Sequence, residues 1–399
     1  MDFTAPRMVT MTAPFDVLGA ELAQRAEAGL LRRRRLVDGM QQPQLIVDGQ
    51  DMLAFCSNDY LGLASAPELL AALQQAAGES GTGSGASHLI SGHHRLHHAL
   101  EHALAQFVGL PGALLFSTGY MANLGIVTAL LGRDDAIFAD RLNHASLNDA
   151  ALLSRAALRR YPHNDLQALE KLLSGSTARR KLVVTDAVFS MDGDIARLPE
   201  LLALCERHDA WLLVDDAHGF GVLGEHGGGV LEHFGLAAPR IIYMATLGKA
   251  AGVSGAFVAG EPQLIDYLVQ TAHTYIYTTA APPALAGALL AALPMMRRPE
   301  RRDHLQQLIS SLRAKLSLRR WHLGASVTPI QPVMIGSNDE ALAASDYLRS
   351  CNILVPAIRP PTVPQNTARL RISLSAAHSP DQVQRLVDAL HAAEKALAA

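Results

Sequence analysis

Short apolar segments alternate with helical segments through the middle of the chain, and this alternation constrains the fold more than any other feature. Apolar runs without a polar face are typical of strands that are buried on both sides. They predict an α/β fold, with a mostly parallel central sheet sandwiched by helices. The expected strands are Ala113–Phe116, Ala136–Ala139, Lys181–Thr185, Trp211–Val214, Ile241–Ala245 and Gly255–Ala259, with helices such as Leu166–Leu173 and Leu198–His208 between them.

The two ends of the chain have other patterns. The N-terminal part predicts an amphipathic helix and then a strand pair around the turn at Asp48-Gly49. The part after Pro299 predicts a smaller α+β domain. We therefore expect an N-terminal segment over 1–57, a large ligand-binding domain over 58–295 and a C-terminal domain over 296–399. The terminal elements expected are helices Phe15–Val37 and Arg301–Leu318, strands Ile330–Ile335, Ile353–Val355 and Leu370–Leu374, and a helix from Pro380.

Composition excludes little but directs the search. A net charge of −3 gives no general attraction for nucleic acid or an anionic membrane. The cysteines Cys56, Cys205 and Cys351 are far apart and form no CxxC pair, which indicates a reducing compartment, and we expect a cytoplasmic protein. We expect no secretory signal and no membrane-spanning segment, because no apolar run is long enough.

The segment Val214–Gly219 places two carboxylates and a histidine directly after an expected strand. Ligands in parallel sheets bind at the carboxyl ends of strands. A carboxylate there can keep a ring nitrogen protonated, which pyridoxal 5′-phosphate (PLP) requires to stabilise negative charge on its substrate. The alternative is an aspartate that caps a strand-to-helix turn.

Lys249 ends the segment Thr246–Lys249, which follows another expected strand and is surrounded by small residues. Burial in such a place lowers a lysine pKa, so the amine can form a Schiff base and later act as a base. The alternative is an exposed lysine with its stem lying along the surface.

Two further segments also follow strands. Ser117–Asn123 opens a helix, whose free N–H groups are suited to a phosphate. Asp140–Ser146 contains His144, an imidazole that can stack on a flat ring, although a lone histidine in such a place is more often a capping or core residue. Near the C-terminus, Arg369 and Arg371 alternate along a strand and point to one face. They can clamp a carboxylate, or they are surface charges on an edge strand.

Two clusters remain open. The histidines between His93 and His102 have helical spacing that suits a metal, but only Glu101 adds an acidic ligand, so we favour a solvated helix face and expect no metal. The run Arg32–Arg35 is compatible with nucleic acid, although its shortness favours a substrate contact and a solvated face. The histidines are His93, His94, His97, His98 and His102.

In this order, the segments resemble the α-oxoamine synthase family of fold-type I PLP enzymes. The resemblance runs from about Leu22 to the C-terminus. It implies a PLP-binding large domain and a decarboxylative condensation of an amino acid with an acyl thioester. The strings that carry it are Ser57–Leu63, Gly83-Ser84-Gly85, Phe189–Asp194, Asp215–His218 and Thr246–Lys249.

The resemblance also implies roles for single residues. Lys249 would carry PLP and act as the base, and Asp215 would pair with the pyridine nitrogen. His144 would stack on the ring and His218 would bond its phenolic oxygen, so these four residues are the expected catalytic set. The other expected contacts are Gly119, Tyr120 and Thr246 at the phosphate, Ser190 beside the ring, Thr278 and Thr279 from the partner of a homodimer, and Asn58, Arg371, Arg32 and Thr362 at the substrates.

The stretch Ala357–Pro364, followed by Thr367–Arg371, is similar to the family branch that condenses L-alanine with pimeloyl-CoA or pimeloyl-acyl-carrier protein in biotin biosynthesis. The alternatives are a sister synthase, such as one joining glycine to an acetyl thioester, and a non-catalytic binding protein of the same fold. Two positions depart from the family pattern: His88 stands where arginine is usual and Asp186 where glutamate is usual.

Overall fold

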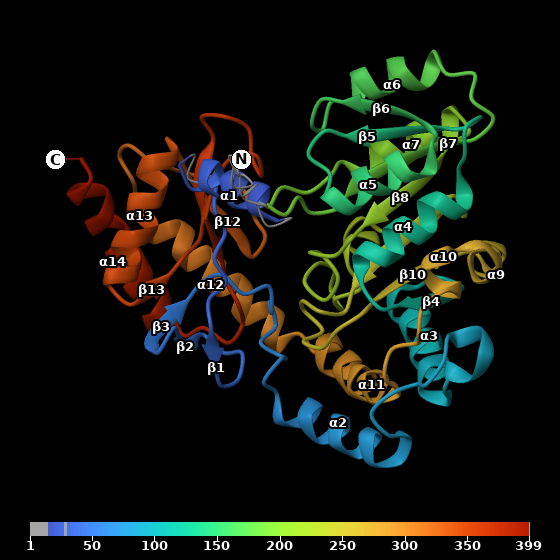
Figure 1. Ribbon diagram of the computed structural model, residues 1–399, viewed down its shortest axis with the longest axis horizontal. Coiled ribbons are helices and arrows are strands. Elements are labelled where there is room, and N and C mark those ends of the chain that lie inside the picture. Colours follow the sequence, from blue (N-terminus) through green and yellow to red (C-terminus); the bar gives the residue numbers. More distant parts are fainter. Residues whose placement is uncertain (1–14, 28–29, 399) are drawn as a thin grey trace, which may run out of the picture.

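The protein was analysed as a computed structural model, which describes residues 15–27 and 30–398. Two lobes lie side by side (Figure 1). One contains a large central sheet with helices packed on it, and the other contains the two ends of the described chain. Within the described residues the strands form three sheets, one of seven strands and two of four.

The seven-stranded sheet forms the large lobe. Strand β10 is antiparallel to both of its neighbours, and the remaining strand pairs are parallel. The predicted mostly parallel sheet is therefore confirmed. In spatial order the strands are β4 (Gly112–Phe116), β10 (Ala256–Gly260), β9 (Ile241–Thr246), β8 (Trp211–Asp215), β7 (Lys181–Asp186), β5 (Ala136–Asp140) and β6 (Ala157–Tyr161).

Each face of this sheet is buried by its own helices. In β7, Val183 belongs to one apolar cluster, whereas Leu182 and Val184 belong to another, as the alternation of a strand requires. One cluster therefore lies on each face of the sheet, which explains the unbroken apolar runs. The helices of this lobe are α2 (Pro67–Ser80), α3 (Arg95–Val108), α4 (Gly119–Leu130), α5 (Ala145–Ser154), α6 (Leu166–Ser174), α7 (Leu198–Arg207), α8 (Val230–Phe234), α9 (Pro262–Thr271), α10 (His273–Ile276) and α11 (Pro283–Arg297), with a π-helical turn η1 (His88–Gly92).

The smaller lobe combines the two ends of the described chain. Its first sheet joins the N-terminal strands to β13 by a parallel pairing of Leu53 with Ile353. The three domain limits given above remain a prediction. The elements are strands β1 (Val37–Asp38), β2 (Gln44–Val47), β3 (Gln50–Ala54) and β13 (Ile353–Leu354), strands β11 (His322–Leu323), β12 (Ile330–Gly336), β15 (Ala368–Ser373) and β14 (Ala357–Ile358), and helices α1 (Asp16–Glu27), α12 (Glu300–Lys315), α13 (Asn338–Ser350) and α14 (Pro380–Ala396).

The first predicted helix is wrong over its second half. Helix α1 ends at Glu27, residues 28–29 lie outside the description, and the chain from Leu30 to Leu36 is not helical. No residue of α1 is buried, so no apolar contact favours a longer helix. Repulsion between the adjacent cations Arg32–Arg35 also disfavours a longer helix. Val37 pairs with Val47 in a sheet instead.

Of the helices in the described ranges, none combines the length and the apolar character needed to cross a membrane.

Candidate active site

A cavity of about 210 Å³ opens where β5, β7, β8 and β9 end and α4 begins. This is the edge at which a parallel sheet collects polar side chains. The structure brings most of the predicted cofactor-binding residues together here. The lining consists of Gly119, Tyr120, His144, Ser146, Asp186, Asp215, Ala217, His218, Met244, Thr246 and Lys249.

Lys249 lies in this cavity, so the alternative of an exposed surface lysine is wrong. Its Nζ lies 2.9 Å from Nε2 of His218, and Nδ1 of His218 lies 2.6 Å from the hydroxyl of Tyr60. Burial lowers the pKa of Lys249 to about 8, against the opposing effect of the nearby carboxylates. Burial, with the charges of Lys249 and Arg371, lowers the pKa of His218 well below its ordinary value. A neutral imidazole therefore faces the amine at neutral pH.

The two successive aspartates at the end of β8 point to different places. Oδ2 of Asp215 accepts a hydrogen bond of 2.8 Å from Asn123, and Oδ1 accepts one from the N–H of Ala217, as the capping alternative expected. Asp216 faces away from the cavity, where it accepts from the N–H of Val230 and the hydroxyl of Tyr243. Only the first carboxylate of the pair can meet a ligand.

His144 and Asp186 form another wall. His144 is the N-cap of α5, so its capping interpretation is also correct, and its Nδ1 lies 2.7 Å from the hydroxyl of Ser146. Oδ1 of Asp186 accepts a 3.1 Å hydrogen bond from the His144 backbone N–H. Burial and the neighbouring Asp215 raise the pKa of Asp186 well above its ordinary value.

The start of α4 forms the anion-binding end of the cavity. Thr118 caps this helix by accepting from the N–H of Met121. Gly119 and Tyr120 occupy the first turn, where backbone N–H groups lack partners within the helix. The hydroxyl of Thr246 lies at the same end and donates to the carbonyl of Gly255. A phosphate fits the unpartnered N–H groups at this helix start.

Arg371 occupies the middle of its sheet, because β15 lies between β12 and β14, so the edge-strand alternative is wrong. Its side chain is 6% exposed and donates to the Ser190 carbonyl at 2.6 Å, to Ser373 at 2.7 Å and twice to Oδ1 of Asn58 at 3.2 Å. Among the described residues these bonds use four of its five N–H groups, which leaves one Nη2–H for a carboxylate. Arg369 is buried too, and it pairs with Asp192.

The other predicted residues lie outside this cavity. Arg32 and Thr362 line a separate pocket of about 580 Å³, between the N-terminal segment and the residues 357–362. Thr278 and Thr279 lie in the loop between α10 and α11, away from the cavity lining. Their predicted contact with a partner subunit remains a prediction.

Sequence reasoning assigned no role to two residues that organise the site. Tyr60 is fully buried and touches both Asn58 and His218. Asn123 is also fully buried and bonds Asp215. Tyr60 stands inside the string Ser57–Leu63 and Asn123 ends the segment Ser117–Asn123, but their spacing gives no signal, because each reaches its partner across the fold.

These residues fit PLP as a resident cofactor. Asp215 is buried, and among the described residues no lysine or arginine forms a salt bridge with it, so a protonated pyridine nitrogen would supply the missing cation. Lys249 provides an amine, the first turn of α4 a phosphate site, and His144 a flat ring for stacking.

Comparisons with known proteins agree with this fit. The family model for aminotransferase class I and II matches residues 50–390. The 8-amino-7-oxononanoate synthase of Methylobacillus flagellatus is 64% identical over 386 residues, which cover 96% of this chain and 98% of that protein.

Solved structures include two useful neighbours. Serine palmitoyltransferase from S. paucimobilis with bound PLP and myriocin has a TM-score of 0.88 at 31% identity, covering 96% of this chain and 98% of that one. The 8-amino-7-oxononanoate synthase of Francisella tularensis has a TM-score of 0.75 at 34% identity, covering 87% and 99%. The shared fold does not separate these activities, whereas the sequence identity does. The chain belongs to the class I and II aminotransferase family and, among its PLP-dependent fold-type I enzymes, to the 8-amino-7-oxononanoate synthases.

Proposed function

We propose that this protein condenses L-alanine with a pimeloyl thioester, carried by coenzyme A or acyl-carrier protein, and thereby makes 8-amino-7-oxononanoate for biotin biosynthesis. A bond forms between the alanine α-carbon and the acyl carbon, the carbon–sulfur bond breaks, and the alanine carboxylate leaves as carbon dioxide. The products are the amino ketone, carbon dioxide and the free thiol.

The observation that carries this proposal is a continuous chain of contacts between the amine and the guanidinium. Lys249 touches His218, His218 touches Tyr60, and Tyr60 donates to Oδ1 of Asn58 at 3.2 Å. Arg371 donates to the same Asn58 oxygen. The chain therefore holds a proton-transfer group and a carboxylate-binding group in one fixed relation, as an amino acid with a reactive α-carbon requires.

When bound, PLP supplies an electron-withdrawing ring that stabilises negative charge at the α-carbon of an attached amino acid. Asp215 would keep the ring nitrogen protonated, and the N–H groups of Gly119 and Tyr120 would hold the phosphate. Arg371 and Asn58 bind the alanine carboxylate. Lys249 takes the proton from the α-carbon and returns one after carbon dioxide has left. Its pKa of about 8 suits both directions of transfer at neutral pH.

The acyl group is expected in the second pocket. Arg32 stands at its wall with Thr362 and the Pro360-Pro361 turn, and its cationic side chain suits the distal carboxylate of a pimeloyl group. The apolar side chains of Leu22 and Ile358 in the same wall suit the methylene chain.

A homodimer in the cytoplasm is the expected working form. Thr278 and Thr279 would reach the phosphate of the second subunit, which would complete each site from the other chain. Sedimentation at micromolar concentration is expected to give a mass of two chains. A monomer that retains full activity would remove the roles of both threonines.

The test of the proposed reaction is the fate of the alanine carboxylate. With carboxyl-labelled alanine and pimeloyl-CoA, labelled carbon dioxide and free thiol are expected in equal amounts. Thiol release without labelled carbon dioxide would indicate thioester hydrolysis and would overturn the proposal.

Replacing Arg371 and Arg32 one at a time is expected to distinguish the alanine site from the acyl site. Arg371→Lys loses the fork geometry of the guanidinium and should raise the KM for alanine about 10- to 100-fold, the effect of one or two charged hydrogen bonds. Arg32→Ala should leave that KM unchanged and raise the KM for the pimeloyl thioester about two- to fivefold, because Arg32 is exposed and its charge is screened. Steady-state kinetics with each substrate varied in turn checks both. Equal effects of one variant on the two KM values would contradict these assignments.

Tyr60→Phe removes the hydroxyl that lies against Nδ1 of His218. Without this partner His218 no longer has a fixed tautomer, so kcat should fall about tenfold, and the pH midpoint of the visible absorbance of the PLP-loaded enzyme should move by about half a unit or more. The control is Tyr243→Phe, another buried tyrosine, whose hydroxyl donates to Asp216 outside the cavity. A midpoint that stays at the wild-type value in Tyr60→Phe would show that the tyrosine only fills space.

A further inference from the structure

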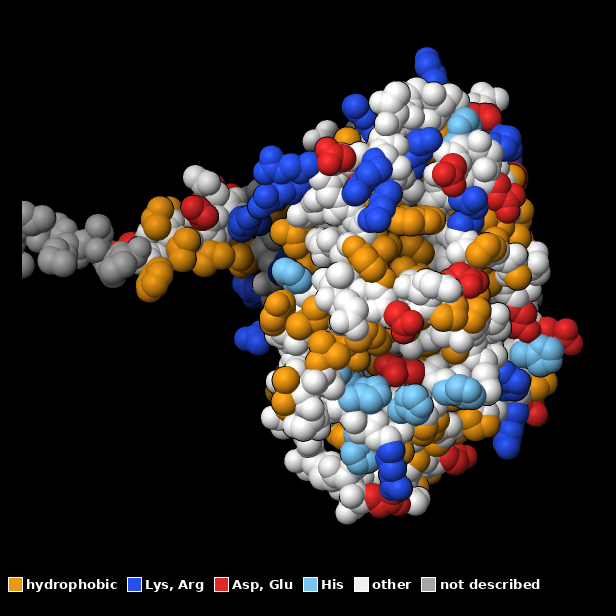
Figure 2. All heavy atoms as spheres, turned by 90° about the vertical axis from the view of Figure 1, so that its right-hand side faces the viewer, with side chains coloured by type: hydrophobic (Ala, Val, Ile, Leu, Met, Phe, Trp, Pro, Cys, Tyr) orange, Lys and Arg blue, Asp and Glu red, His pale blue; other side chains and the backbone are white. Residues whose placement is uncertain are grey.

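Histidine side chains gather on one face of the large lobe (Figure 2). They come from the turn before α3 and from its first two turns, and two groups have ligand atoms within 4.8 Å of one another. The first group is His88, His93 and His97, and the second is His93, His98 and Glu101. The expected solvated helix face is wrong for His97, which is 1% exposed.

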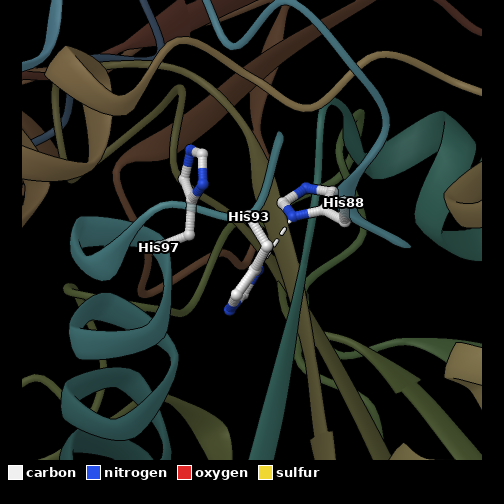
Figure 3. A group of neighbouring side chains, drawn as sticks. All are labelled: His88, His93 and His97. Atoms are coloured by element: carbon white, nitrogen blue, oxygen red, sulfur yellow. Dashed lines mark hydrogen bonds between the residues drawn. The ribbon is translucent and has the colours of Figure 1, made fainter. Parts of the chain in front are cut away.

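In the first group His97 has a structural role. Its Nδ1 accepts from the backbone N–H of His94 in a capping box, and its Nε2 lies 2.8 Å from the carbonyl oxygen of Ala281. Both ring nitrogens are therefore occupied, and a metal would have to break one of these bonds. Figure 3 shows the His97 ring pointing away from the ring of His93.

In the second group, each residue keeps a nitrogen or oxygen lone pair with which it can bind a metal. Nε2 of His93 faces Oε2 of Glu101 at 3.9 Å. His98 and Glu101 are one turn apart on α3 and so share a helix face. None of the described residues forms a hydrogen bond or ion pair with the His98 ring, which is exposed and free to turn toward the other two. Two ligands on one zinc ion lie roughly 3.4 Å apart at the tetrahedral angle, so only a small movement of His93 and Glu101 is needed.

Neighbouring groups orient these ligands. Nδ1 of His93 lies 3.0 Å from Nδ1 of His88, as the dashed line in Figure 3 marks. Through its own Nδ1, His88 can accept a hydrogen bond from Nδ1–H of His93. That tautomer leaves Nε2 of His93 unprotonated and turned toward Glu101. The other oxygen of Glu101 accepts at 3.0 Å from the N–H of Leu115. Ligands supported in this way are typical of protein metal sites.

The carboxylate itself lacks a cation. Glu101 has a side chain that is 12% exposed, and among the described residues no lysine or arginine pairs with it. Burying this carboxylate without a cation costs free energy of desolvation. A divalent ion would offset that cost of desolvation directly.

We propose that His93, His98 and Glu101 form a binding site for one zinc ion, with His88 orienting His93 from behind. Two imidazoles and one carboxylate match the ligand preference of zinc and leave a fourth position for water. None of the three ligands lines the cavity around Lys249, so this site is separate from the condensation chemistry.

The test is a zinc titration of the PLP-loaded, chelator-stripped enzyme against a chromophoric zinc chelator. Wild-type protein is expected to bind one zinc ion per chain. His98→Ala and Glu101→Gln should each weaken binding at least tenfold. His98 is exposed, and a glutamine at 101 can still accept from Leu115, so both variants are expected to fold, which their unfolding temperature without zinc checks.

The matched control is His102→Ala, an exposed histidine of the same helix that belongs to neither group. It should bind zinc as the wild type does. Cobalt(II) in place of zinc should give visible bands of tetrahedral coordination that His98→Ala loses. Binding weakened equally by His102→Ala, or wild-type binding no tighter than that of His98→Ala, would overturn the proposal.

Discussion

Replacing Lys249 with alanine is expected to lower the condensation rate by about 10⁴-fold, the upper end of the effect of one acid–base group. The side chain supplies the attachment point for PLP, and its amine moves the proton at the α-carbon. Burial lowers the pKa of this amine to about 8. The cavity lining contains no other lysine that could replace it. The loss should therefore not be recovered by raising the pH.

Borohydride reduction followed by mass spectrometry measures this directly. Wild-type protein should retain a reduced PLP adduct on Lys249, and Lys249→Ala should retain none. Lys171→Ala is the control, because Lys171 is exposed on α6, and it should behave as the wild type. A reducible adduct of full yield in Lys249→Ala would place the cofactor on another residue.

Asp215→Asn is expected to lower kcat by about 10²- to 10³-fold, as the removal of one charged group aimed at the reacting centre does. An asparagine keeps the volume, and its single carbonyl oxygen can still accept from either Asn123 or Ala217, so the fold should persist with the loss of one hydrogen bond. It cannot keep a pyridine nitrogen protonated, because it carries no charge. The absorbance of the PLP-loaded variant should shift as well, which separates a change at the cofactor from a loss of folded protein.

Asp216→Asn is the matched control for this change. Asp216 is the next residue, is fully buried and faces the N–H of Val230 and the hydroxyl of Tyr243. Burial raises its pKa to about 7, so a neutral side chain there resembles a state it already samples. It should change the free energy of unfolding by about 1 kcal/mol and leave the absorbance unchanged. If both asparagine variants shift the absorbance equally, Asp215 is not the partner of the ring.

The sheet could be predicted because its strands are buried on both faces. A strand such as β7 needs apolar residues throughout, and that pattern is visible in one sequence. Strand β6 could not be predicted, because it lies at the edge of the sheet and contains Arg159 and Arg160. The predicted length of α1 was wrong for a related reason. Helical spacing alone does not show whether a helix face will pack against another element.

The residues of the site also divide into those that the sequence predicts and those that it does not. Asp215 ends β8 and Lys249 stands in the turn after β9, so the rule for parallel sheets places them at one edge without knowledge of the tertiary structure. The contact of Tyr60 with His218 spans 158 positions of the chain, and that of Asn123 with Asp215 spans 92. Such contacts depend on the tertiary fold, which spacing along the chain does not reveal. The same limit applies to Arg371, whose burial follows from the strand order β12, β15, β14.

The measurement that tests the central claim most directly is a competition for substrates in one tube. The purified PLP-loaded enzyme receives equal concentrations of alanine, glycine and serine with pimeloyl-, acetyl-, succinyl- and palmitoyl-CoA, and mass spectrometry identifies the amino ketones formed. The account predicts 8-amino-7-oxononanoate as the dominant product. A dominant product from any other pair would contradict the assignment to alanine and the pimeloyl group, and no product from any pair would contradict the proposed reaction itself.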